Sequence, residues 1–114
     1  MPNRKAPIEQ TFIALSDPTR RAVVQALSEG AATVSQLADP FDMALPSFTQ
    51  HLGVLESAGL IVSRREGRSR VCSLNPAALK DAEDWMASYR KQWESRLDRF
   101  EAHLKNVEKG KSND

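Results

Sequence analysis

Apolar residues recur every three or four positions through most of the chain, which is the spacing of residues that share one face of an α-helix. Between residues 60 and 74 they alternate with polar residues, which indicates a β-hairpin. The pattern therefore predicts a mainly α-helical chain with one small hairpin. The expected helices cover residues 8–15, 18–29, 33–39, 46–58 and 76–107.

Two of the predicted helices start with the same arrangement of residues. Asp17 and Asn75 can each accept a hydrogen bond from a backbone N–H of the first turn, so each is expected to cap a helix. Pro18 and Pro76 follow them at the first helical position, where the missing N–H would be unsatisfied anyway. The buried face of the first helix is expected to comprise Ile8, Phe12 and Leu15.

The stretch from residue 34 to residue 60 joins two predicted helices through a short turn. In the second helix, Phe48, Leu52 and Leu55 are spaced i, i+4, i+7 and are expected to face the core. Pro46 suits its first turn, and Gly59 suits the left-handed residue that ends it. The other side chains of its first half form hydrogen bonds and include no acid: Ser47, Thr49, Gln50 and His51. This arrangement favours insertion into a DNA major groove.

The predicted hairpin is the most basic part of the chain. We expect its turn at Glu66 and Gly67. Alternation predicts that one face carries Leu60, Val62, Cys72 and Leu74. The arginines around the turn are Arg64, Arg65, Arg68 and Arg70. Charges also protect exposed strand edges, but beside two helices of this kind they favour contact with DNA.

The last predicted helix carries one continuous apolar stripe. Its members are spaced by 3.5 residues on average, the period of helices that pack along a seam: Leu79, Ala82, Met86, Tyr89, Trp93, Leu97, Phe100, Leu104 and Val107. A helix of about thirty residues is longer than so small a core can cover, so part of the stripe is expected to contact another chain. A cofactor pocket lined by Trp85, Tyr89 and Trp93 is the alternative, which we favour less.

Several short motifs follow one another in a characteristic order. They are LSDPTRR from Leu15, VSQLA from Val34, PSFTQHL from Pro46, AGL from Ala58, RREGR from Arg64 and SLNP from Ser73. In this order they resemble the ArsR family of bacterial winged-helix repressors, over roughly residues 8–85. Each motif alone is weak, whereas their combination is specific.

The resemblance implies a winged helix-turn-helix that dimerises through the first helix and the long C-terminal helix. The hairpin is then the wing beside the recognition helix. The residues expected to contact DNA are Ser35, Gln36, Pro46, Ser47, Thr49, Gln50, His51, Arg65, Arg68 and Arg70. Those expected at the dimer interface are Ile8, Phe12, Trp85, Met86, Tyr89, Trp93, Leu97 and Phe100.

Two residues depart from the pattern of the family. Pro40 is expected to end the first helix of the DNA motif early, because the residue before a proline disfavours the helical conformation. Asp42 replaces the usual turn glycine and is expected to adopt the left-handed conformation. In addition, Gly53 lies inside the recognition helix, where glycine costs about 1 kcal/mol relative to alanine. It either permits a close approach or is merely tolerated.

Four polar side chains have two interpretations each. Arg20 and Arg21 either reach phosphates or are solvated charges, and we weigh the two equally. Ser35 either contacts a phosphate near a helix N-terminus or caps that helix. His51 either contacts DNA or packs against the turn of the motif.

Length and cysteine content narrow the possible classes of protein. At 114 residues the chain suits one domain, expected at residues 8–107 between disordered tails at 1–7 and 108–114, and a domain of this size benefits from dimerisation. Its single cysteine, Cys72, excludes an internal disulfide and fits a reducing cytoplasm. No apolar run approaches the ~20 residues of a membrane span.

Metal-binding and catalytic patterns are missing from the sequence. Metal-sensing members of the resembled family use cysteines on the first helix of the DNA motif, or Asp and His pairs on the last helix. Residues 31–37 contain no cysteine, and His103 has no second histidine four residues away. We therefore expect no metal, no cofactor and no enzymatic activity.

The expected function is a homodimeric, sequence-specific DNA-binding regulator that represses transcription from a palindromic operator. The alternative is a homodimeric module that binds a protein or a small ligand without recognising an operator. The arginine-rich hairpin distinguishes the two, because a module of the second kind does not need it.

Overall fold

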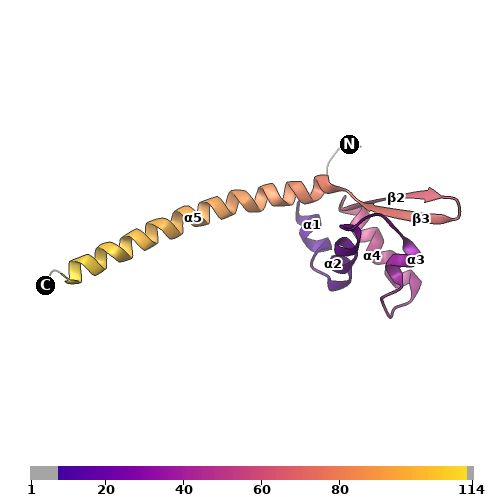
Figure 1. The fold of residues 1–114 in the computed structure, drawn as a ribbon, viewed down its shortest axis with the longest axis horizontal. Coiled ribbons are helices and arrows are strands. Elements are labelled where there is room, and N and C mark those ends of the chain that lie inside the picture. The colour runs from indigo at the N-terminus through magenta and orange to yellow at the C-terminus, as the bar shows by residue number, and fades with distance from the viewer. Residues whose placement is uncertain (1–7, 113–114) are drawn as a thin grey trace. The chain divides into compact units, whose positions relative to one another are not determined.

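The structure is a computed structural model that describes residues 8–112. The predicted tail at residues 1–7 and the last two residues, 113–114, lie outside the described residues. The chain forms two compact units that meet between Ala82 and Glu83. The elements are α1 (Ile8–Ala14), α2 (Pro18–Leu27), β1 (Ala32–Thr33), α3 (Val34–Ala38), α4 (Leu45–Ser57), β2 (Ile61–Glu66), β3 (Ser69–Leu74) and α5 (Pro76–Ser112) (Figure 1).

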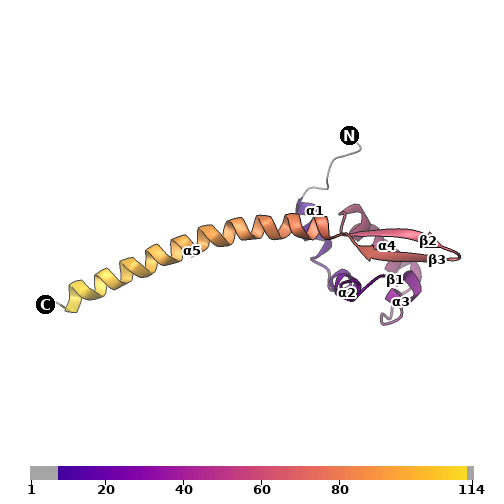
Figure 2. The same cartoon turned by 45° about the horizontal axis from the view of Figure 1, so that its top comes forward.

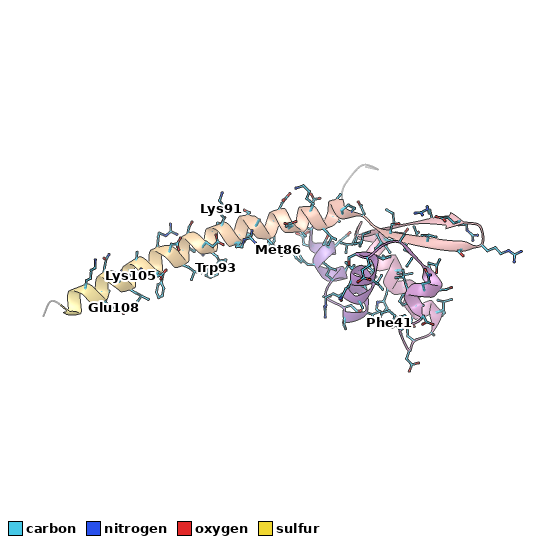
Figure 3. The ribbon with its side chains drawn as sticks, in the orientation of Figure 1. Phe41, Met86, Lys91, Trp93, Lys105 and Glu108 are labelled. Carbon is cyan, nitrogen blue, oxygen red and sulfur yellow. The ribbon has the colours of Figure 1, made fainter. Side chains whose placement is uncertain are left out.

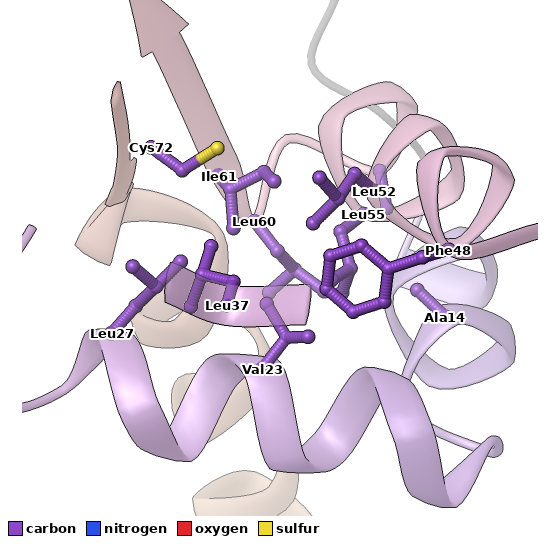
Figure 4. Packing of buried hydrophobic residues seen from close by; sticks show 11 residues of the cluster. Ala14, Val23, Leu27, Leu37, Phe48, Leu52, Leu55, Leu60, Ile61 and Cys72 are labelled. Atoms are coloured by element: carbon purple, nitrogen blue, oxygen red, sulfur yellow. The ribbon is translucent and has the colours of Figure 1, made fainter. Parts of the chain in front are cut away.

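The core of the first unit forms where α2, α3 and α4 meet the sheet (Figure 4). Phe48, Leu52 and Leu55 of α4 are all buried, which confirms the predicted inner face of this helix. They pack with residues from α1, α2, α3 and the strands, among them Ala14, Val23, Leu27, Leu37, Leu60, Ile61 and Cys72. The buried face thereby fixes which side of α4 remains available to a partner.

Local capping defines the start of two helices. Asp17 accepts a hydrogen bond from the backbone N–H of Arg20 at 3.1 Å, with Pro18 in the first turn of α2, as predicted. The cap of α3 is Thr33, whose hydroxyl accepts from the backbone N–H of Gln36 at 3.1 Å, while the Gln36 side chain accepts from the N–H of Thr33 at 2.9 Å. This reciprocal pair satisfies two N–H groups that a helix start leaves open.

The turn between α3 and α4 differs from its prediction. Helix α3 ends at Ala38, before Pro40, as expected. Asp42, however, is not left-handed, because no non-glycine residue among residues 8–112 has a positive φ. The turn is held instead by Phe41, whose ring lies 5.4 Å from that of buried Phe48. Gly59 ends α4 with φ +77°, which confirms its predicted role.

The buried face of α1 was predicted only in part: Leu15 is partly buried against the core and Ile8 is partly buried, but Phe12 is exposed. The residues that α1 buries most are Thr11 and Ala14, whereas Phe12 is 37% exposed. Both buried residues are small, and small side chains let α1 pack closely against α4. Hydrophobic spacing favoured the larger residues and missed Thr11 and Ala14.

The sheet has a third strand that the sequence did not reveal. Its strand order is β1-β3-β2, with Ala32 opposite Cys72 and Thr33 opposite Val71. Alternation cannot be detected in two residues, so β1 was assigned to a loop and a helix start. In the hairpin, Glu66 pairs with Ser69, so the turn is Gly67–Arg68, one residue later than expected. Gly67 has φ +63°, as the first position of a type II′ turn requires.

The residues of β2 that face the core differ by one position from the prediction. Ile61 is buried and pairs with Leu74, whereas Val62, predicted to face inward, is 51% exposed. The alternation was counted from Leu60, which is buried but precedes the strand. Because side chains alternate between faces, an error of one residue reverses the whole strand. Ser63 consequently shares the face of Cys72.

The C-terminal helix continues past its predicted end. Asn75 accepts a hydrogen bond from the backbone N–H of Ala77 at 3.4 Å at its start. The helix runs to Ser112, so residues 108–112 of the predicted disordered tail are helical. Along this helix Arg90 Nε and Glu94 Oε1, four residues apart, approach to 4.0 Å. None of the described helices is long and apolar enough to cross a membrane.

Candidate nucleic-acid interface

The first turns of α4 expose several polar side chains after Leu45, which is itself exposed. Pro46, Ser47, Thr49 and Gln50 are all exposed, and Phe48 between them is buried. The buried phenyl ring anchors the helix, so the four neighbours face away from the core. Serine, threonine and glutamine offer both hydrogen-bond donors and acceptors, which is what base edges in a major groove require.

His51 points away from this surface. Its Nδ1 lies 3.1 Å from Nη1 of Arg20 and 3.7 Å from Oδ2 of Asp17, both of which belong to the start of α2. The structure therefore places His51 between α2 and α4, where it joins two helices. This position favours a packing role over a base contact, so we remove His51 from the residues expected to read DNA.

Arg20 follows neither of its two predicted interpretations. Its Nε donates to the carbonyl of Ala14 at 2.7 Å and its Nη2 donates to that of Ile13 at 3.2 Å. These carbonyls belong to the last turn of α1, where the helix supplies no following turn of N–H groups, and that of Ile13 also accepts from the N–H and hydroxyl of Ser16. The guanidinium is thus engaged within the protein. Arg21 likewise donates to the carbonyl of Leu15 at 2.8 Å.

Helix α3 presents two exposed polar residues. Ser35 is not the cap, because Thr33 holds that position, and its side chain is exposed. Gln36 is exposed too, but its side-chain oxygen serves the capping box. Its NH₂ group keeps the donor character that a phosphate contact requires.

The four arginines of the hairpin fall into two groups. Arg64 donates to Glu66 at 2.7 Å, and Arg70 donates to Ser63 at 2.9 Å and lies 3.5 Å from Glu56. Arg65 and Arg68, by contrast, are exposed and have no ion-pair partner anywhere in residues 8–112. Figure 2 shows the hairpin as a long ribbon extending beyond α3 and α4. Arg68 belongs to its turn, because Glu66 pairs with Ser69. Arg65 and Arg68 are therefore the hairpin arginines whose charges are available to bind DNA phosphates.

A groove of about 480 Å³ connects the recognition helix to the wing. It runs between α3, α4 and the hairpin, and its polar lining includes Ser35, Thr49, Glu56, Arg68 and Arg70. The structure thereby brings together side chains that were predicted separately. The sequence analysis missed Glu56, although Thr49, Gly53 and Glu56 are spaced i, i+4, i+7 and so share a helix face.

Cys72 lies at the inner end of the same groove and is 1% exposed. Burial raises the pKa of its thiol, and Glu56 adds to the increase while Arg70 opposes it. A thiol with a raised pKa is a poor nucleophile at neutral pH. Within residues 8–112 no three His, Cys, Asp or Glu side chains cluster to hold a metal ion.

The second unit, residues 83–112, exposes the apolar stripe of α5. The exposed fractions of Trp93, Leu97 and Phe100 are 57%, 56% and 59%. In Figure 3, Met86 and Trp93 leave the helix on one side and Lys91 on the other. The rings of Trp85 and Tyr89 lie 4.5 Å apart, so these two aromatics contact each other along the helix. A stripe of this size is characteristic of a surface that associates.

Comparison with known proteins shows that this chain is similar to transcriptional regulators. A family model described as a helix-turn-helix domain matches residues 15–64. The transcriptional repressor SdpR of Bacillus subtilis is 35% identical over 82 residues, covering 72% of this chain and 91% of SdpR. The regulator Rv2034 of Mycobacterium tuberculosis is 39% identical over 71 residues, covering 62% of this chain and 66% of Rv2034.

A solved structure agrees with these relatives. The crystal structure of an ArsR family transcriptional regulator is 48% identical, with a TM-score of 0.73. The match covers 76% of this chain and 96% of that protein. The agreement therefore extends across nearly the whole of the compared regulator.

Proposed function

Because the chain belongs to the ArsR family of winged helix-turn-helix transcriptional regulators, we propose that it is a homodimeric repressor that binds a palindromic operator. In this proposal the first turns of α4 enter the major groove and the hairpin follows the adjacent backbone. Repression results from occupying a promoter, and the protein works where the DNA is, in the cytoplasm.

One observation carries the proposal: an acid-free polar surface on α4 is flanked by two unpaired arginines on the wing. Ser47, Thr49 and Gln50 are assigned to base edges. Arg65 and Arg68 are assigned to phosphates or the minor groove, because their charges are not neutralised within the described chain. Pro46, Ser35 and Gln36 border this surface and complete the proposed contact area.

The dimer follows from the exposed apolar residues. The stripe of α5 and the exposed Phe12 of α1 are proposed as the surfaces that meet across a two-fold axis. A two-fold dimer presents two recognition helices, which must lie ~34–36 Å apart to enter successive major grooves of one DNA face. A palindromic operator is the DNA counterpart of that symmetry.

The decisive experiment selects bound sequences from a random pool of duplex DNA and then measures affinity at physiological salt. We expect an enriched palindrome, and sedimentation of the complex as two protomers per duplex. Recovery of no preferred sequence, while the protein remains folded, would contradict operator recognition.

A second candidate function is supported by the same aromatic stripe. Trp93 at 57% exposure is also suited to binding a protein partner or an apolar ligand. Replacement of Arg65 and Arg68 by alanine separates the two functions. A repressor loses DNA binding with this variant, whereas an interaction module that does not use DNA keeps all its partners.

A further inference from the structure

Glu56 is an acidic side chain in the groove beside the acid-free surface that we assign to base edges. It lies on α4 two turns after Thr49, and both residues line the groove between the recognition helix and the wing. Its side chain is 41% exposed. A carboxylate in this position repels DNA phosphates, so its presence requires a physical explanation.

The explanation lies in three contacts that join α4 to both strands of the wing. The hydroxyl of Ser63 on β2 donates to Glu56 Oε1 at 2.8 Å. Arg70 on β3 donates through Nε to the Ser63 hydroxyl at 2.9 Å, and its Nη2 lies 3.5 Å from Glu56 Oε2. Arg70 is thus held on the groove side by a carboxylate and a hydroxyl.

We propose that Glu56 sets the DNA specificity of this protein by withholding Arg70 from phosphates. This inference rests on the proposed function. Phosphate contacts strengthen binding to all sequences equally, since they read charge and not base identity. An arginine neutralised by Glu56 adds nothing to non-specific binding, which leaves the base contacts of α4 a larger share of the affinity. Arg65 and Arg68 remain the wing residues that contact the backbone.

The ion pair between Glu56 and Arg70 contributes little to the stability of the fold. Arg70 is 57% exposed and the ion pair is open to solvent, where such pairs contribute ~0.2–1 kcal/mol. Removal of the carboxylate therefore releases Arg70 without disturbing the core. Each phosphate contact steepens the dependence of log K on log salt by ~0.9, so one released arginine per protomer adds about 1.8 in a dimer.

The test measures affinity for the selected operator and for a scrambled duplex of the same length between 50 and 300 mM salt, by fluorescence anisotropy. Glu56→Gln should steepen both salt slopes by about 1.8 and lower the ratio of operator to scrambled affinity. The double variant Glu56→Gln/Arg70→Gln lacks both charges of the pair and should keep the salt slopes of the wild type, because the paired Arg70 adds nothing to phosphate binding there. Glu29→Gln, which makes the same change of charge outside the groove, serves as the control.

A second variant guards against a folding defect. Ser63→Ala removes the bridging hydroxyl without changing any charge, and it should steepen the slope in the same direction by a smaller amount. Unchanged slopes for Glu56→Gln overturn the inference, and so do slopes of the double variant Glu56→Gln/Arg70→Gln that are flatter than those of the wild type. Both results leave the repressor proposal intact. A wild type that binds neither duplex overturns both proposals.

Discussion

The guanidinium of Arg20 and the imidazole of His51 meet at 3.1 Å, where α2 joins the recognition helix. The same guanidinium holds the carbonyls of Ile13 and Ala14 at the end of α1. One side chain therefore links α1, which we assign to the dimer, with α4, which we assign to DNA. Its position makes the orientation of the recognition helix dependent on the end of α1.

Arg20→Ala should destabilise the protein and weaken operator binding together. It removes hydrogen bonds from a charged donor to two carbonyls, each such bond being worth about 1.5–3 kcal/mol. Urea unfolding and anisotropy on the same samples provide the measurement. Arg21→Ala is the matched control, because Arg21 is exposed and, within residues 8–112, its guanidinium donates to the carbonyl of Leu15 alone. Equal effects of the two variants would refute the linking role of Arg20.

The cap of α2 should make stability depend on pH in the acid range. The pKa of the Asp17 carboxyl is lowered, chiefly because the backbone N–H of Arg20 donates to it, and burial opposes this effect. A carboxyl with a lower pKa in the folded state stabilises the protein above its unfolded pKa of ~3.9, and the contribution disappears as pH falls through the folded pKa. Asp17→Ala should therefore lower the Tm at pH 7 and change it little at pH 2.

Gly53→Ala should raise the free energy of unfolding by about 0.8–1 kcal/mol, the helix-propensity difference between the two residues. A Cβ at this position would meet nothing within 4 Å, so no neighbour within the described chain opposes it. Urea unfolding measures the gain, and operator affinity distinguishes the two interpretations of Gly53. Weaker binding by the more stable variant would show that DNA approaches this residue closely. A loss of stability would contradict the structural argument.

Gln50→Ala should relax the preference at one base pair of each half-site by ~1–3 kcal/mol and leave the other positions unchanged. Gln50 is exposed on the first turns of α4, so its truncation leaves the core intact. Affinities for a panel of single-base operator variants provide the readout. Arg68→Ala serves as the contrast, with a uniform loss across all sequences and a flatter salt slope. A uniform loss for Gln50→Ala would contradict its assignment to a base edge.

Trp93→Ala should weaken the dimer by about 2 kcal/mol or more, roughly thirty-fold in the dissociation constant. Trp93 is 57% exposed within the single chain, where Arg96 lies 6.0 Å from its ring centroid, so most of the energetic penalty of truncation is expected on association. Lys91→Ala, on the opposite side of α5 in Figure 3, is the control. Sedimentation equilibrium with and without chelator measures both variants. A monomeric wild type, or a dimer that dissociates when metal is removed, would contradict this prediction.

Some features of the fold could be predicted from the sequence because their signals are local. Asp17 with Pro18, the spacing of Phe48, Leu52 and Leu55, and Gly59 at the end of α4 each act within one or two turns. The exposed polar residues of α4 follow from the same spacing, since the buried face determines the opposite one. The family resemblance rests on these same positions.

The errors occurred where neighbours distant in the sequence decide the outcome. Strand β1 exists only because β3 pairs with it, and the phase of β2 depends on Ile61 meeting Leu74. The face of α1 was decided by the space that α4 leaves, which admits Ala14 and excludes Phe12.

The roles of the charged residues could also not be assigned by counting. Four arginines indicated a basic wing, but only the folded chain brings Glu56 to Arg70 and His51 to Arg20. Sequence spacing determines which face of one helix a side chain occupies. Packing between helices and strands determines which opposite charge it meets there, and so whether the charge remains available to DNA.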